Sequence, residues 1–107
     1  IVSNSVDHTT LQAAVVPLET ARLAHNLLQH LPDLAKFGNA NAVSDVGVAG
    51  LLASAACKGA LFNVEININS LPDDRATTLR KDMEELRIRC RDKSREIMHR
   101  VHDRLQS

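Results

Sequence analysis

The stretch that decides the fold is GALFNVEININS, residues 59–70, because its pattern fits two different secondary structures. Apolar and polar residues alternate strictly over residues 62–69, which is typical of a half-buried strand. The rest of the sequence offers no second strand, and an isolated strand is unstable. In a helix, Asn63 and Asn67 would lie one turn apart and in line with Gly59. We therefore predict a helix that is buried on more than one side, with both amides directed into a helical bundle.

The segment just before this stretch is rich in small side chains. Four of them are spaced three, four and three residues apart, and on a helix they form one narrow stripe: Gly47, Gly50, Ser54 and Cys57. Such a stripe lets another helix approach closely, although each glycine costs about 1 kcal/mol of helix propensity relative to alanine. Tight packing within the chain and a subunit interface explain this stripe equally well.

The first third of the sequence predicts another helix. Apolar residues recur at helical spacing from Leu11 to Leu31, and the threonines just before them can cap the N-terminus. Pro17 and Pro32 lie inside this pattern and predict a bend or a restart. Gly38 is well placed to end the last turn.

A third helix is predicted after Pro72, which suits a helix start. Its apolar stripe continues for roughly thirty residues, so the helix would be about 45 Å long. The stripe consists of Leu79, Met83, Leu86, Cys90, Ile97, Val101 and Leu105. The many charged residues beside it, mixed in sign, are most simply a solvent-exposed face.

Helices of this length in a chain of 107 residues cannot cover all of each other's faces. The fold class we predict is therefore all-α: a bundle of long antiparallel helices that is incomplete without partner chains. Residues 1–107 would form a single helical domain, with residues 1–10 as an arm that the pattern does not place. Because the sequence begins with Ile1 rather than methionine, we also expect it to be a piece of a longer protein.

Composition and charge narrow the classes of partner. Thirteen Lys and Arg residues balance thirteen Asp and Glu residues, so neither nucleic acid nor a membrane surface is an expected partner. No apolar run approaches the roughly 18 to 20 residues that span a bilayer. Cys57 and Cys90 lack metal-like spacing, and we expect both to be reduced core residues of a cytoplasmic protein. The five histidines show no spacing that implies a metal, so no metal site is expected.

Three motifs carry a resemblance to a known family. They are Val-Pro-Leu at residues 16–18, Gly-Asn-x-x-x-x-Ser-Asp-x-x-Val-Ala at residues 38–49, and Gly-Ala-x-x-Asn-Val-x-x-Asn at residues 59–67. Together they resemble the C-terminal half of the cyclodeaminase domain of formimidoyltransferase-cyclodeaminase, a family that includes the bacterial methenyltetrahydrofolate cyclohydrolases. The likeness runs from about residue 11 to the end of the chain.

The resemblance implies an all-helical dimer that acts on a reduced folate, with tetrahydrofolate as substrate and one-carbon carrier. In the cyclodeaminase reaction, N10 of tetrahydrofolate attacks the formimino group on N5, the ring closes to the methenyl cation and ammonia leaves. Cyclohydrolase relatives instead open the methenyl ring with water. Both reactions pass through a tetrahedral centre and need an acid or a base beside it. The family domain also has an N-terminal half with a Gly-rich segment, which has no counterpart in this sequence.

Candidate site residues are polar groups at or near helix ends. Asp45 is the first candidate for a catalytic acid, because it falls at a helix N-terminus beside an Asn-rich turn, although it can instead bind a pterin amino group or cap the helix. Carboxamides offer donors and acceptors to a heterocycle, and a serine hydroxyl there is either a cap or a ligand contact. The ligand-binding candidates are Asn39, Asn41, Ser44, Asn63 and Asn67.

Three functions remain open at this point. The first is part of a folate cyclodeaminase or cyclohydrolase, active only with its missing N-terminal half and in a homo-oligomer, dimeric or higher. The second is a non-catalytic helical assembly module that keeps the family interface. The third is a helical interaction domain whose likeness to the family is only structural. We expect the chain by itself to be inactive.

Overall fold

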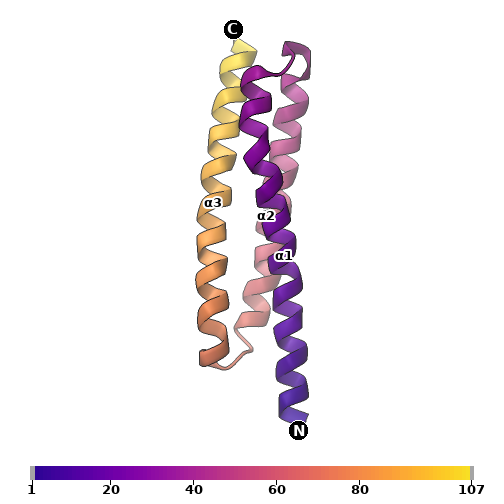
Figure 1. Cartoon of the computed structure of the whole chain (residues 1–107), viewed down its shortest axis with the longest axis vertical. Coiled ribbons are helices and arrows are strands. Elements are labelled where there is room, and N and C mark those ends of the chain that lie inside the picture. Colours follow the sequence, from indigo (N-terminus) through magenta and orange to yellow (C-terminus); the bar gives the residue numbers. More distant parts are fainter. Residues whose placement is uncertain (1, 107) are drawn as a thin grey trace.

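The protein is a rod of three helices in a computed structural model, which describes the backbone of residues 2–106 and the side chains of Thr9 and residues 11–106. The helices are α1 (Val2–Phe37), α2 (Val43–Ile68) and α3 (Asp73–Gln106), with a short 3-10 turn, η1 (Ala40–Ala42), before α2. Each helix contacts the other two, and the rod measures 62 × 17 × 15 Å. Helix α2 runs antiparallel to both neighbours (Figure 1). The described residues contain no strand, so the predicted all-α bundle is confirmed.

The stretch that decides the fold is helical, since α2 continues to Ile68. On one side of α2, Leu61, Val64 and Ile68 are buried against the bundle. On another side, Phe62 is 64% exposed and Ile66 is 67% exposed. The expectation that this stretch is buried on more than one side is therefore wrong within a single chain, because three helices cover only one face of α2.

The stripe of small residues packs inside the chain. All four of its members are buried: Gly47, Gly50, Ser54 and Cys57. A Cβ atom on Gly50 would lie 2.9 Å from Cγ2 of Ile97, and one on Gly47 would lie 3.2 Å from Cγ1 of Val101. The glycines therefore allow α3 to approach α2 closely, and packing within the chain is the role that the structure gives to the stripe.

Helix α1 continues through both of its prolines. It begins at Val2 rather than near the threonines expected to cap it, and Pro17 and Pro32 lie inside it. The predicted restart is wrong, and for Pro17 the structure supplies a reason. Proline has no N–H to donate to the carbonyl four residues earlier, which is that of Ala13. The side-chain Nδ2 of Asn67 donates to this carbonyl oxygen instead, at 3.2 Å.

The end of α1 is fixed by its own glycine and by α3. The helix ends at Phe37, as Gly38 predicted. A Cβ atom on Gly38 would collide with the carbonyl oxygen of Leu34, so a larger residue does not fit this turn. The guanidinium of Arg104 donates to the carbonyl oxygens of Ala35, Lys36 and Gly38, at 2.9, 2.8 and 3.0 Å. Two of the last carbonyls of α1, those of Ala35 and Lys36, which have no partner within the helix, are thereby satisfied.

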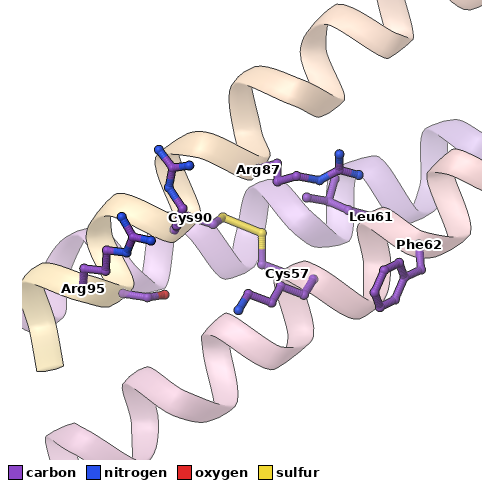
Figure 2. Close-up of a pocket in the computed structure, with 9 residues that line it drawn as sticks. Cys57, Leu61, Phe62, Arg87, Cys90 and Arg95 are labelled. Carbon is purple, nitrogen blue, oxygen red and sulfur yellow. A yellow bond between two sulfur atoms is a disulfide. The ribbon is translucent and has the colours of Figure 1, made fainter.

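Cys57 and Cys90 form a disulfide that joins α2 to α3 (Figure 2). Their Cα atoms are 7.0 Å apart, and their sequence separation is 33. Cys57 is completely buried and Cys90 is 2% exposed. The expectation of two reduced thiols is therefore contradicted. Each cysteine was correctly placed in the core, but only the register of α2 against α3 brings the two sulfur atoms together.

Helix α2 also corrects the expectation that no segment is long enough to span a bilayer. By length and composition alone, the helical segment from Ala40 to Ile68 passes that test, and it is the one such segment among the described residues. The core helix of a helical bundle passes the same test. Here α2 packs against both α1 and α3, but only 39% of its apolar window is buried in the single chain, so much of its apolar surface stays exposed.

Candidate functional site

Four predicted site residues cluster at the turn between α1 and α2. Asn39 precedes η1, and its side-chain oxygen accepts a hydrogen bond from the backbone N–H of Asn41 at 2.9 Å. Ser44 and Asp45 lie in the first turn of α2. All four residues are exposed. The residue that precedes α2 is Ala42, which makes no side-chain cap, so of the two roles expected for Ser44 that of a helix cap is wrong.

The exposed carboxylate of Asp45 is open to a ligand. No hydrogen bond or ion pair to Asp45 is recorded within residues 2–106, although the helix dipole favours its negative charge at this position. The turn beside it is held by Arg104, which binds the end of α1. Arg104 was not singled out in the sequence, although a basic residue near helix C-terminal carbonyls is a recognised capping partner.

The other two predicted residues lie near the far end of α2. Asn63 is eighteen residues beyond Asp45, which corresponds to about 27 Å along the helix. The two groups of candidates are therefore not brought together within one chain. Asn63 is exposed, which contradicts the expectation that it points into the bundle, and Asn67 is half-buried.

The amide of Asn67 has structural partners. Its Nδ2 donates to the carbonyl oxygen of Asn63 at 2.8 Å and to that of Ala13 at 3.2 Å. Both donor hydrogens are thus used for backbone carbonyls, in accordance with the rule that buried polar groups find partners. The side-chain oxygen of Asn67 remains the atom that could accept a hydrogen bond from a ligand.

His25 is a titratable group that the sequence pattern did not single out. It is 6% exposed and lies on α1, in a groove shared with Arg89, Lys93 and Glu96 of α3. Burial lowers the pKa of His25 below its ordinary value, and the positive charges of Arg89 and Lys93 lower it further. A neutral imidazole in a groove can accept a proton, which makes His25 a candidate base. Only the packing of α1 on α3 reveals this feature.

The lowered pKa of His25 predicts how stability depends on pH. The unfolded chain takes up a proton near pH 6.5, whereas the folded chain does so only at lower pH, so stability rises as pH rises through this window and is fully present above about pH 6.5. The slope contributed by one proton is at most about 1.4 kcal/mol per pH unit. Urea unfolding between about pH 5.5 and 7.5 should show a weaker pH dependence for His25→Gln than for wild type. His30→Gln, an exposed histidine on the same helix, is the control, and an equal change in both variants would contradict the prediction.

Metal-ligating side chains do not cluster in the described part of the chain. No group of three or more His, Cys, Asp or Glu residues there has the geometry to hold a metal ion.

Comparison with known proteins assigns the chain to a family. The family model described as formiminotransferase-cyclodeaminase matches residues 2–85. The chain belongs to this family. The match begins at residue 2, so the formiminotransferase-cyclodeaminase likeness includes residues 2–10, which the motifs left unplaced. It ends at residue 85, before the last part of α3.

Individual relatives carry two different names. The chain is 40% identical over 63 residues to the formimidoyltransferase-cyclodeaminases of Rattus norvegicus and Mus musculus, a match that covers 59% of the chain and 12% of each relative. It is 41% identical over 64 residues to the methenyltetrahydrofolate cyclohydrolase of Methylorubrum extorquens, covering 60% of the chain and 30% of that relative. The chain thus spans less than a third of the length of these relatives.

Proposed function

We propose that this chain is part of a folate-dependent one-carbon enzyme, a cyclodeaminase that converts formimino-tetrahydrofolate to methenyl-tetrahydrofolate and releases ammonia. The family match over residues 2–85 is the observation that supports this proposal. On this reading the substrate is a reduced folate, with tetrahydrofolate as the carrier. The 107 residues are inactive by themselves and act together with further chain or further copies.

Asp45 is the proposed proton-transferring group of this reaction. Its carboxylate is exposed at the start of α2, beside the carboxamides of Asn39 and Asn41. In the proposal these amides and the hydroxyl of Ser44 hold the polar edge of the folate ring system, because such groups both donate and accept hydrogen bonds. Asn63 and Asn67 would contribute from the other end of α2 only if a second copy brought that end close.

A second copy is the partner that the exposed face of α2 fits best. Six exposed small or apolar residues follow one another at spacings of four, three, four, three and four, which is the seam of a coiled coil: Val48, Leu52, Ala55, Gly59, Phe62 and Ile66. We call this set the α2 row. Exposed apolar residues continue on the neighbouring α1: Val16, Leu23, Leu27, Leu34 and Phe37. Extensive exposed apolar surface of this kind is typical of an interaction site.

The α2 row is complementary to itself in the antiparallel direction. If two copies cross at residue 57, Leu52 meets Phe62, Val48 meets Ile66 and the small pair Ala55 and Gly59 meets at the centre. A twofold dimer requires such self-complementarity. The same crossing would place Asp45 of one copy within about one turn of Asn67 in the other. This geometry supports a homodimer in which the two copies together complete two equivalent folate sites, one at each end of the crossing.

The proposal is tested with the protein encoded by the full reading frame that contains this sequence. We expect release of ammonia from formimino-tetrahydrofolate, and a loss of about 100-fold in kcat for Asp45→Asn if Asp45 transfers a proton. Asp74→Asn is the matched control, because Asp74 is also an exposed acid in the first turn of a helix. No ammonia release by the full protein, or an equal loss in both variants, would overturn the assignment. Ammonia release by the 107 residues alone would instead contradict their expected inactivity.

Two alternatives give different results in the same assay. A methenyltetrahydrofolate cyclohydrolase, the name carried by the Methylorubrum extorquens relative, would open the methenyl ring without releasing ammonia. A non-catalytic assembly module would show neither activity yet would still self-associate through the α2 row.

We also propose the cytoplasm as the compartment in which this protein works. Thiols there are kept reduced, so the proposal requires that the buried Cys57–Cys90 pair be shielded from reductants. A fluorescent fusion in the native host tests the compartment.

A further inference from the structure

The turn between α1 and α2 carries two of the candidate ligand-binding amides, yet the apolar core does not hold this turn in place. Ala35 near the end of α1 and Val43 at the start of α2 are buried, whereas none of residues 36–42 between them is buried. An exposed segment of this kind samples many conformations unless hydrogen bonds restrict it. The groups that fix the carboxamides of Asn39 and Asn41 must therefore be polar.

A side chain from the far end of the sequence supplies these hydrogen bonds. Arg104 lies half-buried in the last turn of α3, and the C-terminus of the chain is at the same end of the rod as the α1–α2 turn (Figure 1). Its Nη1 atom donates to the carbonyl oxygens of Ala35 and Lys36, and its Nη2 atom donates to that of Gly38. These bonds join residues that are 66 to 69 positions apart in the sequence. The positive charge is also favourable at the C-terminal end of α1.

The bond to Gly38 acts directly on the residue that follows it. The carbonyl of Gly38 and the N–H of Asn39 belong to one planar peptide unit, so a fixed carbonyl oxygen fixes the plane from which Asn39 continues. Asn39 then holds the rest of the turn. Its side-chain oxygen accepts from the N–H of Asn41, and its carbonyl oxygen accepts from the N–H of Ala42, both at 2.9 Å. A series of hydrogen bonds therefore runs from Arg104 to both carboxamide residues.

The packing of α3 on α2 fixes the position of Arg104. Val101, three residues before it, is buried against Gly47, where a Cβ atom would come within 3.2 Å of Cγ1 of Val101. Gly47 lies in α2 only two residues beyond Asp45. The contact that places Arg104 is therefore also next to the helical turn that carries the candidate acid. Both Val101 and Arg104 lie beyond residue 85, where the family match ends.

We propose that Arg104 is a positioning residue of the candidate folate site, which holds the α1–α2 turn so that the carboxamides of Asn39 and Asn41 are already arranged for the ligand. This inference rests on the proposed function. Arg104 acts through the turn, because the hydrogen bonds described here go to backbone carbonyls. Without Arg104, only a fraction of the molecules would have the turn in the binding arrangement, and the apparent affinity falls by that fraction. Asp45 keeps its place in α2, so bound substrate should still react.

The test compares Arg104→Gln with wild type in the protein encoded by the full reading frame. The KM for formimino-tetrahydrofolate and the Kd for folinic acid, a stable reduced folate, should each rise about tenfold, while kcat changes by less than about twofold. The backbone amides of Asn41 and Ala42 should exchange hydrogen about tenfold faster, as followed by mass spectrometry. A purely structural role would instead reduce the amount of folded protein and leave KM and Kd unchanged.

Two further variants make the comparison specific. Arg104→Lys keeps the charge but lacks the planar fork that reaches several carbonyls, so the Kd for folinic acid should rise only about threefold. This variant also decides the matter if Arg104→Gln does not fold. Arg100→Gln is the matched control, because Arg100 is also a half-buried arginine of α3, and its Nη2 atom donates to Glu96 of the same helix at 3.3 Å. Its Kd should change by less than about twofold.

The outcomes separate the role of Arg104 from the assignment of the reaction. An unchanged affinity for folinic acid in the Arg104 variants, or an equal loss in Arg100→Gln, overturns the positioning role even if the wild type releases ammonia. A wild type whose folinic acid binding depends on Arg104, but which releases no ammonia, supports the positioning role and overturns the cyclodeaminase assignment. A wild type that does not bind folinic acid overturns both.

Discussion

Leu52→Glu is expected to keep the chain monomeric at concentrations at which the wild type sediments as a dimer. Leu52 is 67% exposed in the single chain, so the substitution leaves the bundle itself unchanged. In the proposed crossing it meets Phe62, and the twofold axis places two such contacts in each dimer. Each contact would then bury an unpaired carboxylate in apolar surroundings, which costs several kcal/mol. The dissociation constant should therefore rise by about a thousandfold or more.

Sedimentation equilibrium measures this change in the dissociation constant, and two further variants test whether the change arises at the α2 row. Leu105→Glu adds the same charge at another exposed leucine outside the α2 row, and it should leave the dimer intact. Gly59→Leu should also prevent dimer formation, because a Cβ atom on Gly59 meets nothing within 4 Å in the monomer but would block the crossing. A wild type that stays monomeric at high micromolar concentration, or a Leu52→Glu dimer, would refute the proposed interface.

Reduction of the disulfide is expected to lower the free energy of unfolding by about 3.7 kcal/mol, from the entropy of a loop closed between Cys57 and Cys90 at a sequence separation of 33. The bond holds α2 against α3 halfway along the rod, so its loss lets the unfolded chain explore more conformations. Urea unfolding with and without a phosphine reductant measures the difference.

The control for this comparison is the double variant Cys57→Ala/Cys90→Ala, whose stability should not respond to the reductant. A thiol assay on denatured protein purified without reductant should find no free thiol, since both cysteines of the sequence are in the bond. Two reactive thiols in that assay, or identical unfolding midpoints with and without reductant, would show that the two helices are not covalently joined.

Much of the fold could be predicted from local patterns. The helical character of residues 59–68 followed from the lack of a partner for a strand, and the close approach of α3 followed from the small side chains at Gly47 and Gly50. The face of α2 that would be buried could not be predicted, because apolar residues surround this helix on nearly all sides. Only the positions of α1 and α3 distinguish buried Val64 from exposed Phe62.

Features that depend on long-range register were missed for the same reason. The continuity of α1 through Pro17 depends on Asn67, fifty residues away, and the disulfide depends on how α2 and α3 align. For the candidate site, the sequence identified the polar residues at the two ends of α2. Their separation along the helix, and the burial of His25 beside Arg89, required the packed bundle.

The hydrogen bond from Asn67 to Ala13 also bears on the order in which the protein is assembled during synthesis. A proline inside a helix costs about 3 kcal/mol when nothing compensates for it. As the chain leaves the ribosome, Pro17 emerges long before the carboxamide that compensates for it. We therefore expect the part of α1 before Pro17, residues 2–16, to pack into the rod only after translation has passed residue 67.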